Sequence, residues 1–146
     1  MQGKLLGLLI FAAPLTAIGS QVAKQYGISE LMAESTRVTQ GVVRRVDSER
    51  ASDGRIMSRV QLDVSRTVPA SSARTMEFVV AGGAMDGVSM SVAGSPQPQV
   101  GEEVLVFLRG ERLVGQGQGF YLSHADRWVR PEFGGPQAPQ VHRAED

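Results

Sequence analysis

The clearest pattern in the chain is an alternation of apolar and polar residues between positions 56 and 68. A period of two predicts a β-strand with one buried and one solvated face. The buried face is expected to carry Ile56, Ser58, Val60, Leu62, Val64 and Val68. Residues from Val38 onward also alternate, with Val42, Arg44 and Val46 on one face, and residues 48–54 form a polar turn around Asp53-Gly54. The two segments therefore predict a β-hairpin.

Several shorter segments extend this β pattern toward the C-terminus. A third strand is expected from Met76 to the glycine pair Gly82-Gly83, and a fourth at 88–92. The continuous apolar run 104–108 predicts the most buried strand. Short strands at 120–122 and 128–129 complete a mainly β fold. A barrel and an open sandwich both fit this alternation.

One short helix is expected ahead of the first strand. Ser29 is followed by helix-forming residues, and Ile28, Leu31, Met32 and Ser35 fall on one side of the predicted helix. This side is expected to cover one end of the sheet.

The N-terminal segment resembles a secretory signal peptide. Lys4 precedes the apolar run 5–13, and Ala17-Ile18-Gly19 offers small residues for cleavage. The run is too short to cross a bilayer as a stable helix, and Pro14 argues against the alternative of a buried helix over 5–18. We therefore expect an exported protein, periplasmic or extracellular, with no stable membrane anchor once the leader is removed.

The remaining chain is long enough for one domain. We expect a signal peptide at 1–19, a flexible lead-in at 20–27, a β-barrel domain at 28–130 and a disordered tail at 131–146, which is polar and contains three prolines.

Charge and cysteine content exclude several classes of protein. The 15 basic residues are balanced by 15 acidic ones, so no overall field attracts nucleic acid or an anionic membrane. Cysteine is absent, which excludes disulfide stabilisation and a lipid anchor attached to cysteine. Six arginines lie at 44–66, but four acidic residues in the same span offset most of their charge. No aromatic residue lies between them for base stacking, so this segment does not favour a nucleic-acid site.

The order of several motifs resembles a family of small exported bacterial proteins without assigned activity, over about residues 28–122. These motifs are Ile28-Ser29-Glu30-Leu31, Gly41-Val42-Val43, Asp53-Gly54-Arg55-Ile56, Gly82-Gly83, Gly94-x-Pro96 and the segment 100–108. The chain is also distantly similar to netrin-like domains, including the tissue inhibitors of metalloproteinases. This resemblance implies a small antiparallel barrel of the oligonucleotide/oligosaccharide-binding (OB) type with a short N-terminal helix. Those inhibitors present an N-terminal cysteine to a metal, and this chain has none, so that mechanism is not carried over.

Candidate catalytic and metal-binding patterns are weak. His124 and Asp126 have no histidine or cysteine partner at metal-ligand spacing. Gly94-Ser95-Pro96 is not a nucleophile elbow, and paired Glu102-Glu103 are expected to face opposite sides of a strand. The glycines at 115, 117 and 119 lack the lysine and serine or threonine of a nucleotide-binding loop, and favour a hairpin in which Phe120 or Trp128 packs over the main chain. We expect no enzyme activity, no cofactor and no metal.

The sequence favours a noncatalytic module that binds a protein or cell-envelope component through the loops of the barrel. The partner is unknown and is not expected to be nucleic acid. A structural envelope or matrix component is one alternative, and a minor hydrolase using His124, Asp126 and a serine is another. The residues expected to contact a partner are Arg55, Arg59, Pro96, Pro98, Gln116 and Gln118.

Overall fold

A computed structural model describes residues 24–131 and the strand at 141–143. The predicted signal peptide, residues 20–23 of the lead-in and most of the expected tail lie outside this described part. In chain order the elements are α1 (Ile28–Glu34), β1 (Arg37–Arg50), β2 (Ile56–Val68), β3 (Thr75–Ala81), β4 (Gly83–Met85), β5 (Val88–Met90), β6 (Glu103–Arg109), β7 (Arg112–Leu113), the 3₁₀ helix η1 (Gln116–Gly119), β8 (Phe120–His124), β9 (Arg127–Val129) and β10 (Val141–Arg143).

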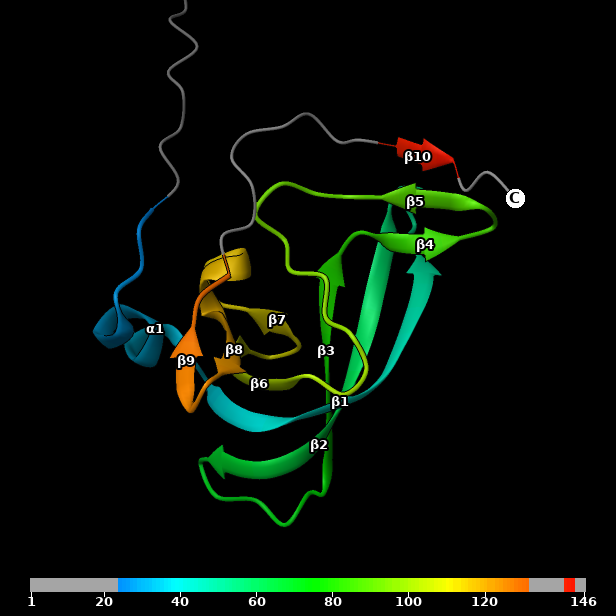
Figure 1. The fold of residues 1–146 in the computed structure, drawn as a ribbon. Helices are drawn as coiled ribbons and strands as arrows, with labels where there is room; N and C mark the ends of the chain where they lie inside the picture. The colour runs from blue at the N-terminus through cyan, green and yellow to red at the C-terminus, as the bar shows by residue number, and fades with distance from the viewer. Residues whose placement is uncertain (1–23, 132–140, 144–146) are drawn as a thin grey trace, which may run out of the picture.

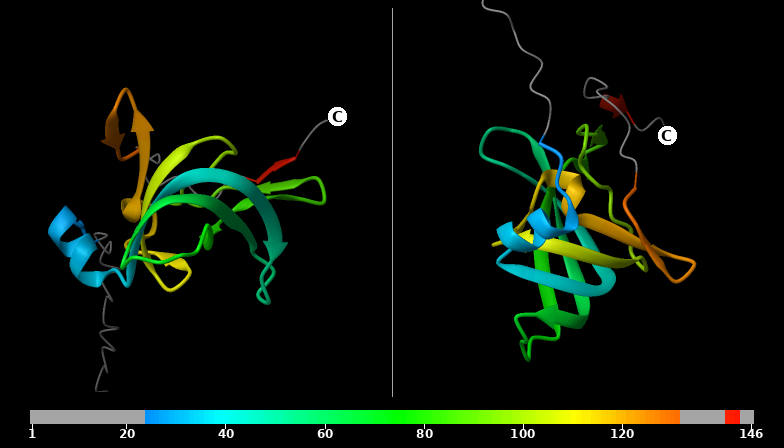
Figure 2. Two further views of the ribbon diagram at one scale, coloured as in Figure 1. Left: turned by 90° about the horizontal axis from the view of Figure 1, so that it is seen from below. Right: turned by 90° about the vertical axis from the view of Figure 1, so that its left-hand side faces the viewer.

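Seven strands form one sheet that closes in a ring. Their order is β1-β2-β3-β7-β6-β8-β9, and β1 also pairs with β6, which joins the two sides of the sheet. The long strands β1 and β2 arch over the molecule, with α1 beside β6 (Figures 1 and 2). All pairings in this sheet are antiparallel except that of β3 with β7, where Val79 lies opposite Arg112. The mainly β prediction with one short helix is confirmed.

The main core lies inside the ring. It contains the inward side chains of β1, β2, β3, β6 and β8: Val43, Val60, Leu62, Phe78, Val80, Val104, Val106, Leu108 and Phe120. The alternation of β2 is confirmed over its first half, because Ile56, Ser58, Val60 and Leu62 are all buried. Val68 was expected on the same face, but it is 58% exposed, because Ser65 is skipped in the pairing with β1 and Thr67 faces inward to bond the buried Thr39.

Strand β6 is apolar from Val104 to Leu108 because both of its faces are covered there. Val104, Val106 and Leu108 face the main core, while Phe107 packs with Leu31 and Val114 in a second cluster on the other side. The prediction that residues 104–108 form a deeply buried strand is confirmed.

Helix α1 covers β6 through one residue. Leu31 is fully buried, whereas Ile28 and Met32 are 56% and 52% exposed, so the wider apolar side predicted for this helix is wrong. The helix has only seven residues, which limits the area that it can cover. Its N-cap is Gly27 and not Ser29, and no side chain caps its first turn.

Strand β1 alternates with Thr39, Gly41 and Val43 buried, and then departs from this pattern at Arg44, which is left unpaired where Val43 lies opposite Leu62 and Arg45 opposite Gln61. Val42 is consequently 37% exposed, while Val43 is 1% exposed and belongs to the core. Beyond Arg44, Val46 packs against that core. A β-bulge changes which side of a strand faces inward, so the predicted common face of Val42, Arg44 and Val46 is wrong.

A smaller sheet has the order β10-β5-β4 and lies at one end of the ring (Figure 1). Strand β10 comes from the segment expected to be a disordered tail, and Val141 lies opposite Met90 of β5. Within the described ranges, 24–131 and 141–143, no helix has the length and apolar character needed to span a membrane.

Candidate functional site

The main candidate site is a cleft of about 210 Å³ where β2, β3 and β7 meet the loop 91–102. Its apolar lining includes Met57, Val79 and Leu113, and two arginines, Arg55 and Arg112, also line it. Met57 and Val79 alternate along their strands with buried residues, so they point away from the core. We call this surface the arginine cleft.

The loop 91–102 forms one wall of the arginine cleft and is tied down on both sides. The Ser95 hydroxyl donates to the carbonyl of Ala81 at 2.7 Å, which fixes the loop to β3. The backbone N–H of Gly117 donates to the carbonyl of Gly94 at 2.9 Å, which fixes the loop to η1. These bonds hold β3, the loop and η1 in one arrangement around the cleft.

The two arginines of the cleft differ in their surroundings. Arg55 Nε lies 2.6 Å from Asp53 Oδ2. The backbone N–H of Arg55 and then its guanidinium lower the pKa of Asp53, which keeps that carboxylate charged. Arg112 is exposed and makes no ion pair with any residue in the described ranges. The described residues that line the cleft include no aspartate or glutamate.

Arg59, another predicted contact residue, does not line the arginine cleft. Its guanidinium nitrogens lie 3.2 Å from Glu49, 3.4 Å from Glu77 and 3.5 Å from Glu111. The hydrogen bond to Glu49 is the largest cause of its raised pKa. Arg59 therefore ties β1, β2, β3 and the β6–β7 turn together on the outer face of the sheet.

The two prolines that we predicted to contact a partner, Pro96 and Pro98, are buried. Pro96 lines the arginine cleft and also a second cleft of about 450 Å³, which Pro98 lines as well. This neutral cleft is bounded by β1, β2, β4, β5 and the same loop, and no charged side chain is among the described residues that line it. The prolines shape the loop between the two clefts, and they contribute little exposed surface for a partner.

Of the two glutamines that we predicted to contact a partner, one lines the arginine cleft and the other does not. Gln116 is exposed, lines the arginine cleft and has a left-handed backbone with φ of 56°. Gln118 is half-buried and lines neither cleft, because its side chain is bonded to the backbone of Lys24 and Tyr26. Part of the lead-in expected to be flexible is thus held against η1.

Residues 116–119 of the glycine-spaced segment form η1, with Gly115 as the N-cap, and not the hairpin that we predicted. Gly115 has a φ of 64° and lies against the ring of Tyr26, where a side chain would meet that ring. Close packing of an aromatic ring on a glycine was expected, but the ring comes from Tyr26 and not from Phe120 or Trp128.

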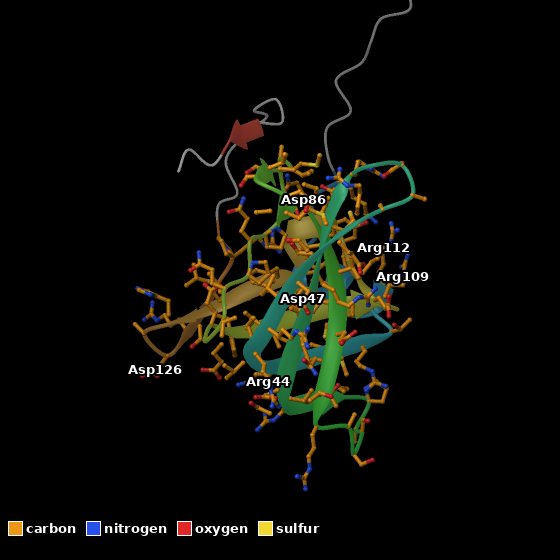
Figure 3. The ribbon with its side chains drawn as sticks, turned by 90° about the vertical axis from the view of Figure 1, so that its right-hand side faces the viewer. Arg44, Asp47, Asp86, Arg109, Arg112 and Asp126 are labelled. Carbon is orange, nitrogen blue, oxygen red and sulfur yellow. The ribbon has the colours of Figure 1, made fainter. Side chains whose placement is uncertain are left out.

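The alternative function, a minor hydrolase, would use His124, Asp126 and a serine. The structure does not bring His124 and Asp126 together with Ser95. His124 lines a third cleft, with Glu102, Glu103 and Ser123, whereas Ser95 lines the arginine cleft. Asp126 lies in the turn at the tip of the β8–β9 hairpin, on the other side of the molecule from Arg112 (Figure 3).

The carboxylates of the third cleft are engaged by amide groups. Glu102 accepts the backbone N–H of Gln99, and Glu103 accepts the side-chain amide of Gln40 at 2.9 Å. The described part of the chain contains no group of three or more histidine, aspartate and glutamate residues that could hold a metal ion.

Three of the six residues predicted to contact a partner, Arg55, Pro96 and Gln116, line the arginine cleft together. The sequence did not single out Arg112 or the apolar residues beside it. A signal was present, because Met57 is an apolar residue on the solvated face of a strongly alternating strand. Comparison of the chain with models of protein families, with curated proteins and with solved structures found no match.

Proposed function

We propose that this chain is an exported, noncatalytic binding module that engages a partner protein of the cell envelope, with the arginine cleft at the centre of the contact. One observation carries the proposal: Arg55, Pro96 and Gln116 come from three segments far apart in the sequence and line one cleft. Binding residues are commonly carried by loops that a rigid scaffold positions.

The size of the arginine cleft favours a protein partner over a cofactor. Sites for small molecules and cofactors usually enclose about 300–1,000 Å³, and this cleft encloses about 210 Å³. Such a volume suits one or two side chains of a partner, and buried anchor residues of this kind supply much of the binding energy at protein interfaces.

The chemistry of the cleft supports binding without catalysis. The described residues that line it include no histidine, aspartate or glutamate that could act as a general base. Its one serine, Ser95, uses its hydroxyl proton to bond the carbonyl of Ala81.

The closed sheet supports, as part of the same proposal, an OB-type barrel similar to netrin-like domains. In the described chain the ring is closed by the pairing of β1 with β6, and α1 lies against β6. The outer face of this ring, where the loop 91–102 meets β2, β3 and β7, is the surface that we assign to the partner.

Site-specific photo-crosslinking in intact cells tests this function. A photoreactive residue at Gln116, on the rim of the cleft, is expected to capture a partner, and Leu113→Asp in the same chain is expected to abolish that capture. A photoreactive residue at Asp126, which is exposed and outside the cleft, is the control. Capture from position 116 that persists in the Leu113→Asp chain, or no capture at all, would contradict the proposal.

One observation favours the alternative of a structural envelope component. Strand β9 is the last strand of the seven-stranded sheet, and its Trp128 and Val129 are 38% and 44% exposed. An exposed apolar edge can pair with another copy. Concentration-dependent sedimentation that disappears in Trp128→Lys would support this alternative, and a constant monomer mass would remove it.

A further inference from the structure

We infer that the arginine cleft accepts an acidic side chain and a neighbouring apolar side chain from an extended segment of the partner protein. This inference rests on the proposed function and specifies the chemistry of the partner at that site.

The apolar half of the inference follows from the lining of the cleft. Met57, Val79 and Leu113 are half-buried and come from β2, β3 and β7, which are neighbours in the sheet. Covering such side chains with another apolar group is favourable by roughly 25 cal/mol for each Å² removed from water. A leucine-sized side chain from the partner would provide this cover.

The acidic half follows from the arrangement of charges around Arg112. Its sequence neighbour Glu111 lies 3.5 Å from Arg59, and Arg59 also contacts Glu49 and Glu77. Arg59 thus engages the carboxylates on this part of the outer face, and Arg112 is left without an ion pair to the described residues.

Arg55 retains donors for a ligand even though it contacts Asp53. The Asp53 carboxylate accepts from the Nε and the backbone N–H of Arg55. The two terminal nitrogens of Arg55 donate no hydrogen bond to a residue of the described chain. An arginine guanidinium can bind a carboxylate through two parallel N–H groups, so Arg55 and Arg112 together favour an acidic side chain.

Gln116 supplies a neutral polar group beside the arginines. Its side-chain amide makes no hydrogen bond with any residue between 24 and 131. An amide can both donate to and accept from a peptide main chain. The lining therefore matches an extended peptide carrying glutamate or aspartate next to an apolar residue.

The test compares two soluble probes, N-acetyl-Glu-Leu-amide and N-acetyl-Gln-Leu-amide, by NMR titration of the full domain at millimolar probe concentration. Exposed charge pairs contribute up to about 1 kcal/mol, which corresponds to about fivefold in affinity. We expect the glutamate probe to bind about three- to fivefold more tightly and to shift the amide signals of Val79, Leu113 and Gln116. Raising the salt concentration is expected to reduce this preference.

Two arginine variants complete the test. Arg112→Gln is expected to remove the preference for the glutamate probe, while Arg127→Gln, which makes the same charge change outside the arginine cleft, is expected to keep it. Equal binding of the two probes, signal shifts confined to other surfaces, no shifts at all, or equal effects of the two variants would each overturn the inference. In those cases, photo-crosslinking of a partner from position 116 that is lost in Leu113→Asp would still support the proposed function. Failure of this inference can therefore be distinguished from failure of the proposed function.

Discussion

Gln118 accepts a hydrogen bond from the backbone N–H of Tyr26 through its side-chain oxygen, at 2.8 Å. The nitrogen of the same side chain donates to the carbonyl of Lys24 at 2.7 Å. One side chain therefore fixes the segment that enters α1 against η1, at a separation of more than ninety residues in the sequence.

Gln118→Ala is expected to loosen the start of the described chain without unfolding the ring. Loss of two hydrogen bonds costs about 1–2 kcal/mol in total, so hydrogen exchange at Tyr26 should quicken by about tenfold. Exchange in β6 should stay unchanged. Gln116→Ala, which removes an exposed side chain from the same 3₁₀ helix, is the control. If hydrogen exchange at Tyr26 were equally fast in Gln118→Ala and Gln116→Ala, Gln118 would not be what holds the segment entering α1 against η1.

Gly41 is required where β1 contacts both of its neighbours. It lies opposite Val64 of β2 and Val104 of β6, and an added Cβ would overlap the carbonyl oxygen of Asp63. Gly41→Ala should therefore destabilise the fold by about 1–3 kcal/mol in urea unfolding, as overpacking of a tight interior does. Gly27→Ala is the matched control, because nothing lies within 4 Å of its Cβ position. If Gly41→Ala left the free energy of unfolding unchanged, β1 and β2 would have to move apart easily at this position, contrary to our expectation.

Asp53 should contribute to the acid sensitivity of the protein. Its pKa is lowered from 3.8, first by the backbone N–H and then by the guanidinium of Arg55. The unfolded chain consequently binds the proton more readily than the folded chain, and stability is lost as the pH falls from about 3.8 through the lower pKa of the folded state. Asp53→Asn keeps the turn geometry and removes the charge.

We therefore expect the stability of Asp53→Asn to fall less steeply than that of the natural chain as the pH falls below 3.8. Urea midpoints measured at several acid pH values check this expectation. Asp126→Asn, at an exposed turn where no ion pair is formed with a described residue, is the control. If the urea midpoints of the natural chain and of Asp53→Asn fell in parallel as the pH is lowered, the expectation would be contradicted.

Arg59→Gln should lower the thermal unfolding midpoint by a few degrees at low salt. Without the guanidinium, Glu49, Glu77 and Glu111 would repel one another across three elements. Added salt screens this repulsion, so the difference from the natural chain should shrink at high ionic strength. Arg44→Gln, which breaks one exposed pair with Asp63, should change the midpoint little. A deficit for Arg59→Gln that does not depend on salt would point to packing and not to charge.

Most of the fold could be predicted from the sequence because burial imposes a period of two on a strand. The doubly covered β6 was identified from its continuous apolar run, and the period of two identified β2, with its buried Ile56 and Val60. It failed in β1, where the register shift after Val43 depends on how β2 and β6 pair with the strand. Strand β4 was not predicted, because three residues beginning at Gly83 are too few to show a period.

The candidate site could be predicted only in part, because it arises from pairing between distant segments. The sequence indicates Pro96 and Gln116 as loop residues and Arg55 as one of the clustered arginines of the first hairpin, and all three line one cleft. Arg112 belongs to a two-residue strand whose pairing with Val79 cannot be read from the local sequence. The engagement of Arg59 by three carboxylates likewise depends on strands β1 and β3 and on the turn at Glu111.

The hydrogen bond from Arg130 to the carbonyl of Tyr26, at 3.1 Å, places the two ends of the segment 24–131 beside each other. Neighbouring ends allow a domain to be circularly permuted. A chain in which residues 24 and 131 are joined by a short linker, with new ends opened in the exposed turn 69–74, would retain every strand pairing of the seven-stranded sheet. The ring could thus be produced without either flanking segment, and the contribution of those segments to folding could be measured by comparison with the full chain.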